Sequence, residues 1–299
     1  MKLTETGRLI KQTLAEFLAD KAMTLGAALA FYTALSIAPM LLLVTVIAGA
    51  AFGEQATRGE IANQLNDLIG EEGAKAVQAM LASTQTPGGG IVSTVVGIVA
   101  LFFGATGVFT SLQDALNTVW NVKPEDSRTG ILGLVRDRVA SFTMICGMAF
   151  LLLVSLVFSA FLTALGGLVN RWMPYGDAWM GAANLVAGFL VTTLMFGMIY
   201  KYLPHARPDW SDVGVGAVVT ALLFTVGKYL IGLYLGTASI GSTYGAAGSF
   251  VVLLVWIYYS SLIVLFGAEL TQVYATKFGS GLTPAGRHRL AGRPDPVPT

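Results

Sequence analysis

The chain alternates between long stretches without charged side chains and short polar connections. Between Arg138 and Arg171, thirty-two consecutive residues carry no charge. Comparable runs occupy residues 22–53, 76–113, 178–200, 213–227 and 229–268. Because a helix of about 20 apolar residues spans the hydrocarbon core of a bilayer, runs of this length are typical of membrane helices. The pattern therefore predicts an all-α polytopic membrane protein.

We expect six transmembrane helices. Their approximate ranges are 22–52, 91–120, 139–169, 179–203, 211–236 and 247–276. The charge-free run 229–268 is too long for one crossing, so it must contain a reversal, for which the small polar residues of 237–245 are suited. This reversal is either a tight hairpin, which we favour, or a loop that dips into the bilayer.

Three segments flank or interrupt the expected spans. Residues 1–21 predict an amphipathic helix that lies in the membrane interface. Residues 53–90 predict an extracytoplasmic insert of short amphipathic helices, and residues 277–299 predict a disordered cytoplasmic tail. The apolar face of the first segment is formed by Leu3, Ile10, Leu14, Phe17 and Leu18.

Composition and charge agree with a membrane protein. Hydrophobic residues make up 55% of the chain and charged residues 12%, against about 25% charged in soluble domains. With both ends inside, fourteen of the eighteen lysines and arginines fall on the cytoplasmic side. This bias follows the positive-inside rule, so we expect a multi-pass inner-membrane protein with both termini in the cytoplasm.

A series of short motifs runs through the expected spans. They are 28–39 (ALAFYTALSIAP), 116–120 (LNTVW), 202–204 (YLP), 244–245 (YG), 256–260 (WIYYS) and 267–270 (GAEL). In this order they resemble the YihY/BrkB family of bacterial inner-membrane proteins, over about residues 25–270. The resemblance implies six helices with both ends cytoplasmic. It also implies a largely uncharacterised biochemistry, with suspected transport or envelope-lipid roles and a mistaken ribonuclease BN label.

Charged side chains inside the expected spans are candidate functional residues, because each costs about 2.5–3.5 kcal/mol at the bilayer centre on insertion scales. Asp114 and Glu269 either form ion pairs near the cytoplasmic interface or form a substrate or proton site. Lys228 either extends its stem to the outer surface or enters a cavity. The cations considered as partners are Arg136, Arg138 and Lys277. The polar residues proposed for a transport path are Asp114, Arg138, Lys228 and Glu269.

Three further polar residues are weaker candidates for the interior of the bundle. Tyr32 and Ser36 lie one helical turn apart close to Pro39, which either opens the helix beside a cavity or only kinks it. Tyr244 lies in the reversal, next to Gly245.

Small residues at every fourth position predict close packing between helices. Gly26 belongs to such a stripe in the first span, and Gly232 and Gly236 repeat the spacing in the fifth. We interpret both as packing features.

Enzymatic chemistry finds little support in the sequence. The two histidines, His205 and His288, belong to no cluster with metal-ligand spacing, and no P-loop or dense basic surface is present. We expect no catalytic residue, metal, cofactor or nucleic-acid partner. The favoured function is to move or handle a small or lipid-like molecule among membrane lipids; replacing Glu269 or Lys228 by a neutral residue should abolish it. The alternative is a scaffold or partner subunit of an envelope complex, docking through residues 55–84.

Overall fold

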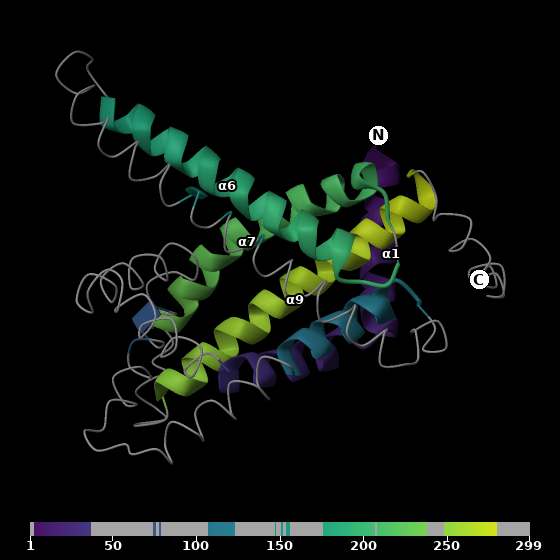
Figure 1. The fold of residues 1–299 in the computed structure, drawn as a ribbon, viewed down its shortest axis with the longest axis horizontal. Helices are drawn as coiled ribbons and strands as arrows, with labels where there is room; N and C mark the ends of the chain where they lie inside the picture. The colour runs from purple at the N-terminus through teal and green to yellow at the C-terminus, as the bar shows by residue number, and fades with distance from the viewer. Residues whose placement is uncertain are drawn as a thin grey trace. The chain divides into compact units, whose positions relative to one another are not determined.

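The computed structural model describes only part of the chain. The described residues are 3–36, 74, 75, 78, 107–122, 147, 151, 154, 155, 176–206, 208–237 and 248–279. Within them every regular element is an α-helix, which confirms the all-α prediction (Figure 1). Most of the expected second and third spans, the insert 53–90, the reversal 238–247 and the tail lie outside the described residues.

The N-terminal helix α1 covers Leu3–Ala19. It ends because Lys21 adopts a left-handed backbone conformation, with φ of 54°, which is rare for a residue other than glycine. A second, apolar helix follows directly and covers Ala22–Ser36. The boundary between the amphipathic segment and the first apolar segment is therefore a sharp break in the helix.

Helices α6 and α7 are separated by a short connection rich in proline. Helix α6 covers Gly176–Tyr202 and ends before Pro204, whose ring disfavours a helical conformation of the preceding residue. Helix α7 covers Trp210–Thr237. Its first turn begins where the carbonyl of Asp209 accepts hydrogen bonds from the N–H groups of Asp212 and Val213, both at 3.1 Å.

Two more long helices lie among the described residues. Helix α9 covers Gly248–Lys277. Residues 107–119 form a helix whose end has the Schellman pattern: Asn121 has φ of 52°, and the Val122 N–H donates to the carbonyl of Asn117 at 2.9 Å.

Three described helices are long and apolar enough to cross a membrane. They are Gly181–Tyr202, Trp210–Tyr234 and Phe250–Lys277, and they coincide with the expected fourth, fifth and sixth spans. The apolar helix Ala22–Ser36 is shorter. Large apolar side chains such as Leu190 of α6 and Leu230 of α7 are more than half exposed, as lipid contact requires. The described residues thus support a membrane protein, while the count of six spans stays a prediction.

The chain divides into two compact units, and each is considered by itself. The first contains Met1–Asp20, Leu116–Leu223 and Phe266–Thr299. The second contains Lys21–Ala115 and Phe224–Leu265.

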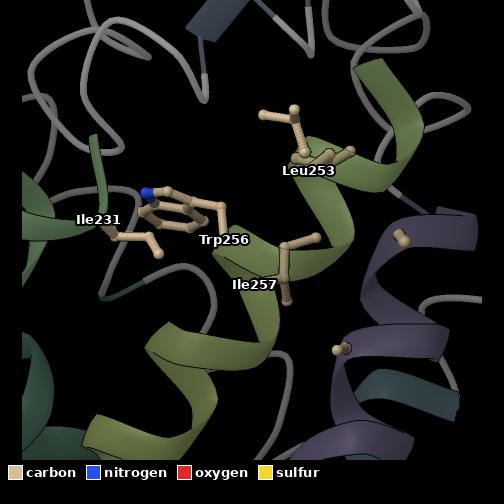
Figure 2. Packing of buried hydrophobic residues seen from close by; sticks show 7 residues of the cluster. Ile231, Leu253, Trp256 and Ile257 are labelled. Atoms are coloured by element: carbon tan, nitrogen blue, oxygen red, sulfur yellow. The ribbon is translucent and has the colours of Figure 1, made fainter. Parts of the chain in front are cut away.

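The core of the second unit lies between α7, α9 and the helix Ala22–Ser36. Figure 2 shows Trp256 of α9 directed towards Ile231 of α7, with Leu253 and Ile257 on the same stretch of α9. The Trp256 ring also meets Phe224 edge-on, with 6.2 Å between ring centroids. On the first apolar helix, Ala30 and Ala34 belong to this core. The aromatic side chain of Trp256 in the middle of α9 therefore packs inside the second unit.

Candidate functional site

A continuous stretch of α9 in the first unit is buried on all sides. Every residue of 267–273 is buried, and the stretch includes the polar side chains of Glu269, Thr271 and Gln272. A membrane helix can hide every face only where other helices cover each of them. Here α1 covers one side and α7 another, as the following contacts show.

Helices α7 and α9 approach each other through two reciprocal pairs of glycine and threonine. A Cβ placed at Gly216 would overlap the side chain of Thr271, and a Cβ placed at Gly267 would overlap that of Thr220. Each threonine therefore fills the space that the glycine of the other helix leaves open. Small residues spaced in this way allow two helix backbones to come close inside a membrane.

The hydroxyl groups at this crossing are all satisfied. Thr271 donates to the carbonyl of Gly267 at 2.6 Å, and Thr220 donates to that of Gly216 at 2.7 Å. Because the Thr220 hydrogen is used in this way, the fully buried Tyr200 of α6 acts as the donor in its 3.0 Å bond to Thr220. Satisfied hydroxyls are needed where no water competes for them.

Helix α1 covers another side of the same stretch (Figure 1). Leu9 packs in one cluster with Leu270 and Val273, and the ring of Phe17 meets that of Phe266 edge-on, with 6.0 Å between centroids. The face of α1 that packs is thus rotated from the apolar face expected from the sequence. Phe17 belongs to both faces, whereas three residues of the expected face, Ile10, Leu14 and Leu18, are half exposed.

Glu269 lies at the centre of this arrangement and is fully buried. Neither of its carboxyl oxygens accepts a hydrogen bond from a described donor. The described charged groups that act on it electrostatically are the carboxyls of Asp20 and Glu16 in the N-terminal segment. No described lysine or arginine is among them, and the expected candidate Lys277 is exposed at the end of α9. Among the described residues, Glu269 is therefore influenced by acids and not by a cation.

The other charged candidates occupy less buried positions. Asp114 is exposed on the helix 107–119. Lys228 is half-buried on α7, and its ammonium lies 5.3 Å from the centre of the Tyr229 ring, which is itself 63% exposed. Both belong to the second unit, whereas Glu269 belongs to the first. Arg138 lies outside the described residues.

Tyr32 and Ser36 have local partners. The ring of Tyr32 packs on Gly107, where an added Cβ would lie 2.5 Å from the ring. The Ser36 hydroxyl donates to the carbonyl of Thr33 at 3.1 Å. Pro39, Tyr244 and Gly245 lie outside the described residues.

The glycines expected at packing positions differ from one another. Gly26 faces α9, since an added Cβ would lie 3.0 Å from Leu262 and 3.6 Å from Tyr258. No described side chain comes within 4 Å of a Cβ at Gly232. Gly236 lies in the last turn of α7.

One polar contact in the first unit escaped sequence reasoning. The Asn117 side chain accepts from the backbone N–H of His205 at 2.8 Å and donates to its Nδ1 at 3.0 Å. Asn117 belongs to the LNTVW motif, and His205 directly follows the YLP motif. The sequence signalled only that LNTVW lies at the end of the predicted second span and YLP at the end of the predicted fourth span.

Metal coordination finds no support in the described part of the chain. None of its histidines, cysteines, aspartates and glutamates form a group of three or more that holds a metal ion.

Comparison with known proteins identifies the family. The sequence profile of the family described as Virulence factor BrkB matches residues 13–290. The chain belongs to the BrkB family. This match covers α7, α9 and the part of α1 from Thr13 onwards, and it includes Glu269.

Several bacterial proteins are similar to this chain over most of its length. A UPF0761 membrane protein of Psychrobacter sp. is 26% identical over 270 residues, which cover 88% of this chain and 48% of that protein. The YihY membrane protein of Salmonella typhimurium is 33% identical over 60% of this chain and 58% of its own length. A ribonuclease-like protein, YfkH, of Bacillus subtilis is 26% identical over 62% of this chain and 66% of its own length.

The chain spans about half the length of the Psychrobacter relative. No solved structure matches it. The comparisons therefore establish an integral membrane protein of an uncharacterised family.

Proposed function

We propose that the protein moves or handles a small or lipid-like molecule in the bacterial inner membrane, and that Glu269 takes part directly. The observation that carries the proposal is the environment of this side chain. A carboxyl group that is fully buried in a membrane helix and lacks a described cation or hydrogen-bond donor is costly to keep. An apolar residue at this position would pack without the cost of burying a carboxyl group. The presence of a glutamate instead is therefore expected where the carboxyl group serves a function.

We do not extend the ribonuclease-like name of YfkH to this chain. Hydrolysis of a phosphodiester needs a metal ion or a free general base. Among the described residues no metal-binding group is present, and the described histidine, His205, is held by Asn117. The ribonuclease-like name therefore stays with YfkH, and the proposal for this chain is a membrane protein that moves or handles a molecule.

The proposal is tested by untargeted lipid and metabolite profiling of a strain that lacks the gene. The strain is complemented with the wild-type chain, with Glu269→Gln, or with Lys277→Gln as a matched control on the same helix. Lys277 is exposed, so its replacement should restore the wild-type profile. Glu269→Gln should leave one class of compound altered although the protein is present in the membrane in normal amount.

Two results would contradict the proposal. Full restoration of the profile by Glu269→Gln would remove this residue from the function. A deletion strain whose profile does not differ from that of the parent would favour a scaffold. The docking segment expected for a scaffold, residues 55–84, lies outside the described residues except for Ala74, Lys75 and Gln78.

The proposed orientation has its own test. We propose six spans with both termini in the cytoplasm, which is supported by the distribution of lysine and arginine. Reporters that are active on one side of the membrane only, fused to each end in turn, should give cytoplasmic signals for both. Signals from opposite sides would overturn an even number of spans.

A further inference from the structure

Helix α1 carries a second apolar side, apart from the one that packs on α9. Leu9 and Phe17 are buried and contact α9. Ile10, Leu14 and Leu18 follow one another at intervals of one turn on a different side of the helix, and each is half exposed. We call these three residues the exposed stripe. A row of large apolar side chains is unfavourable in water, so a partner is expected to cover it.

The charged side chains of the N-terminal segment are divided between its two sides. Arg8 and Lys11 are exposed and lie one turn apart, and Lys11 lies one turn before Leu14 of the exposed stripe. The acids are half-buried and follow the spacing of the packed side; they are Glu5, Glu16 and Asp20. The exposed side of α1 therefore combines apolar and cationic groups, and none of the described acids of this segment lies on it.

The direction of α1 agrees with a position at a membrane surface. Figure 1 shows α1 crossing the end of α9 instead of running along it. Because α9 is long and apolar enough to span a membrane, a helix that crosses its end runs closer to the membrane plane. The contact at Leu270 lies seven residues, or about 10 Å of helix, before the end of α9 at Lys277. Interfacial helices bury their apolar side to a depth of about 5–10 Å.

Two partners are able to cover the exposed stripe, a second copy of the chain or lipid. A second copy would bury Arg8 and Lys11 of both chains beside an apolar contact, without an acid on this side of α1 to pair with them. A bilayer surface instead covers the stripe with acyl chains, while long cationic side chains extend to the phosphate groups. Each cation close to an anionic membrane surface adds attraction. The distribution of charge therefore favours an anionic phospholipid.

We propose that the exposed side of α1 is a docking surface for anionic phospholipid. Acyl chains lie on Ile10, Leu14 and Leu18, and Arg8 and Lys11 bind the phosphate of the headgroup. Helix α1 then has two partners, α9 on one side and lipid on the other. The inference goes beyond the proposed function and does not rest on it, because Glu269 takes no part in this surface.

The experiment uses the purified full chain in phosphatidylcholine vesicles. The parent chain carries Cys146→Ser and Leu18→Cys, so that a single fluorescent label is attached at the end of the exposed stripe. Nitroxide-labelled phosphatidylglycerol or nitroxide-labelled phosphatidylcholine is added in equal small amounts, and quenching of the label reports which lipid lies next to α1. Phosphatidylglycerol should quench more strongly, and its excess should decrease as salt screens the charges.

The double variant Arg8→Gln/Lys11→Gln in this parent tests the cations. It should lower the preference for phosphatidylglycerol about fivefold for each cation removed. The matched control, Arg8→Lys/Lys11→Arg, retains both charges and should retain the preference. Since both side chains are exposed, the thermal midpoints of the two variants in detergent should stay near that of the parent.

A second pair of variants tests the apolar part of the surface. Leu14→Gln should shift the emission of the label to longer wavelength, because a polar side chain in the stripe admits water beside it. Ala15→Gln is the control, since Ala15 is the exposed neighbour outside the stripe, and it should leave the emission unchanged.

Each outcome decides the inference. Loss of the lipid preference in Arg8→Gln/Lys11→Gln alone would support it. Equal quenching by the two lipids in the parent, an unchanged preference in that variant, or an equal loss in the control that retains both charges would overturn it. A disulfide between two chains carrying Leu14→Cys and Cys146→Ser would also overturn it, because a second copy would then cover the stripe. None of these results bears on Glu269→Gln, so either proposal can fail while the other stands.

Discussion

Thr271 of α9 occupies the space in which a side chain at Gly216 of α7 would lie. The relationship is repeated one turn away, where Thr220 of α7 occupies the space beside Gly267 of α9. The two helices therefore carry the same Gly-x-x-x-Thr spacing and interlock through it. This crossing lies in the stretch of α9 that contains the fully buried Glu269.

Gly216→Ala should destabilise the protein by about 1–3 kcal/mol, the usual cost of forcing extra atoms into a packed contact. Thermal or denaturant unfolding in detergent measures the effect. The matched control is Gly214→Ala, two residues away on the same helix, where no described atom lies within 4 Å of the added Cβ. Adding Thr271→Ala to Gly216→Ala should recover only part of the loss, because the Thr271 Cβ itself lies 2.8 Å from the new methyl group. Equal stability of the two glycine variants would contradict the packing described here.

Asn117→Leu should loosen the connection between α6 and α7. It removes the acceptor of the His205 N–H and the donor to its ring, and a buried group left unpaired costs about 1–3 kcal/mol. Asn117→Asp keeps the acceptor for the backbone N–H and should have a smaller effect. The rate of limited proteolysis between Tyr202 and Trp210 reports the change.

The control for this experiment is Thr118→Ala, the exposed neighbour of Asn117. It should leave the cleavage rate near that of the wild type. If Asn117→Leu is cleaved no faster than Thr118→Ala, the contact does not hold the connection.

Gly26→Leu should destabilise the second unit more than Gly26→Ala. The nearest atom to an added Cβ is the flexible end of Leu262, at 3.0 Å, so a single methyl group is accommodated by a small shift. A leucine would in addition meet Tyr258 and Ser261 of α9. Unfolding midpoints in detergent give the order of stability, with Ala27→Leu on the exposed side of the same helix as the control. An order in which Ala27→Leu is the less stable leucine variant would contradict the placement of Gly26.

Part of this structure was predictable because lipid constrains each residue locally. Hydropathy and the positions of charges located the long apolar helices at Gly176–Tyr202, Trp210–Thr237 and Gly248–Lys277, since water and hydrocarbon select residues one by one. The end of α6 at Tyr202 also follows from a local cause, because Pro204 disfavours a helical conformation of the residue before it. The motifs pointed to the family that the comparison then established.

The contacts between helices were not predictable in this way. The pattern of α1 indicated Ile10, Leu14 and Leu18 as its apolar face, but Leu9 and Phe17 pack on α9. In a membrane an exposed apolar face costs nothing, so apolarity alone does not tell which face of a helix meets protein and which meets lipid.

The sequence by itself determined that this protein is helical, apolar and built for a membrane, and it marked Glu269 as a charge that needs a reason. Only the tertiary structure decided that the packing of α1 and α7 on α9 buries Glu269 completely. The physical reason is that solvation is a property of each residue in its medium. Which side chains face each other across two helices depends instead on their rotation and crossing, which are set by contacts far apart in the chain.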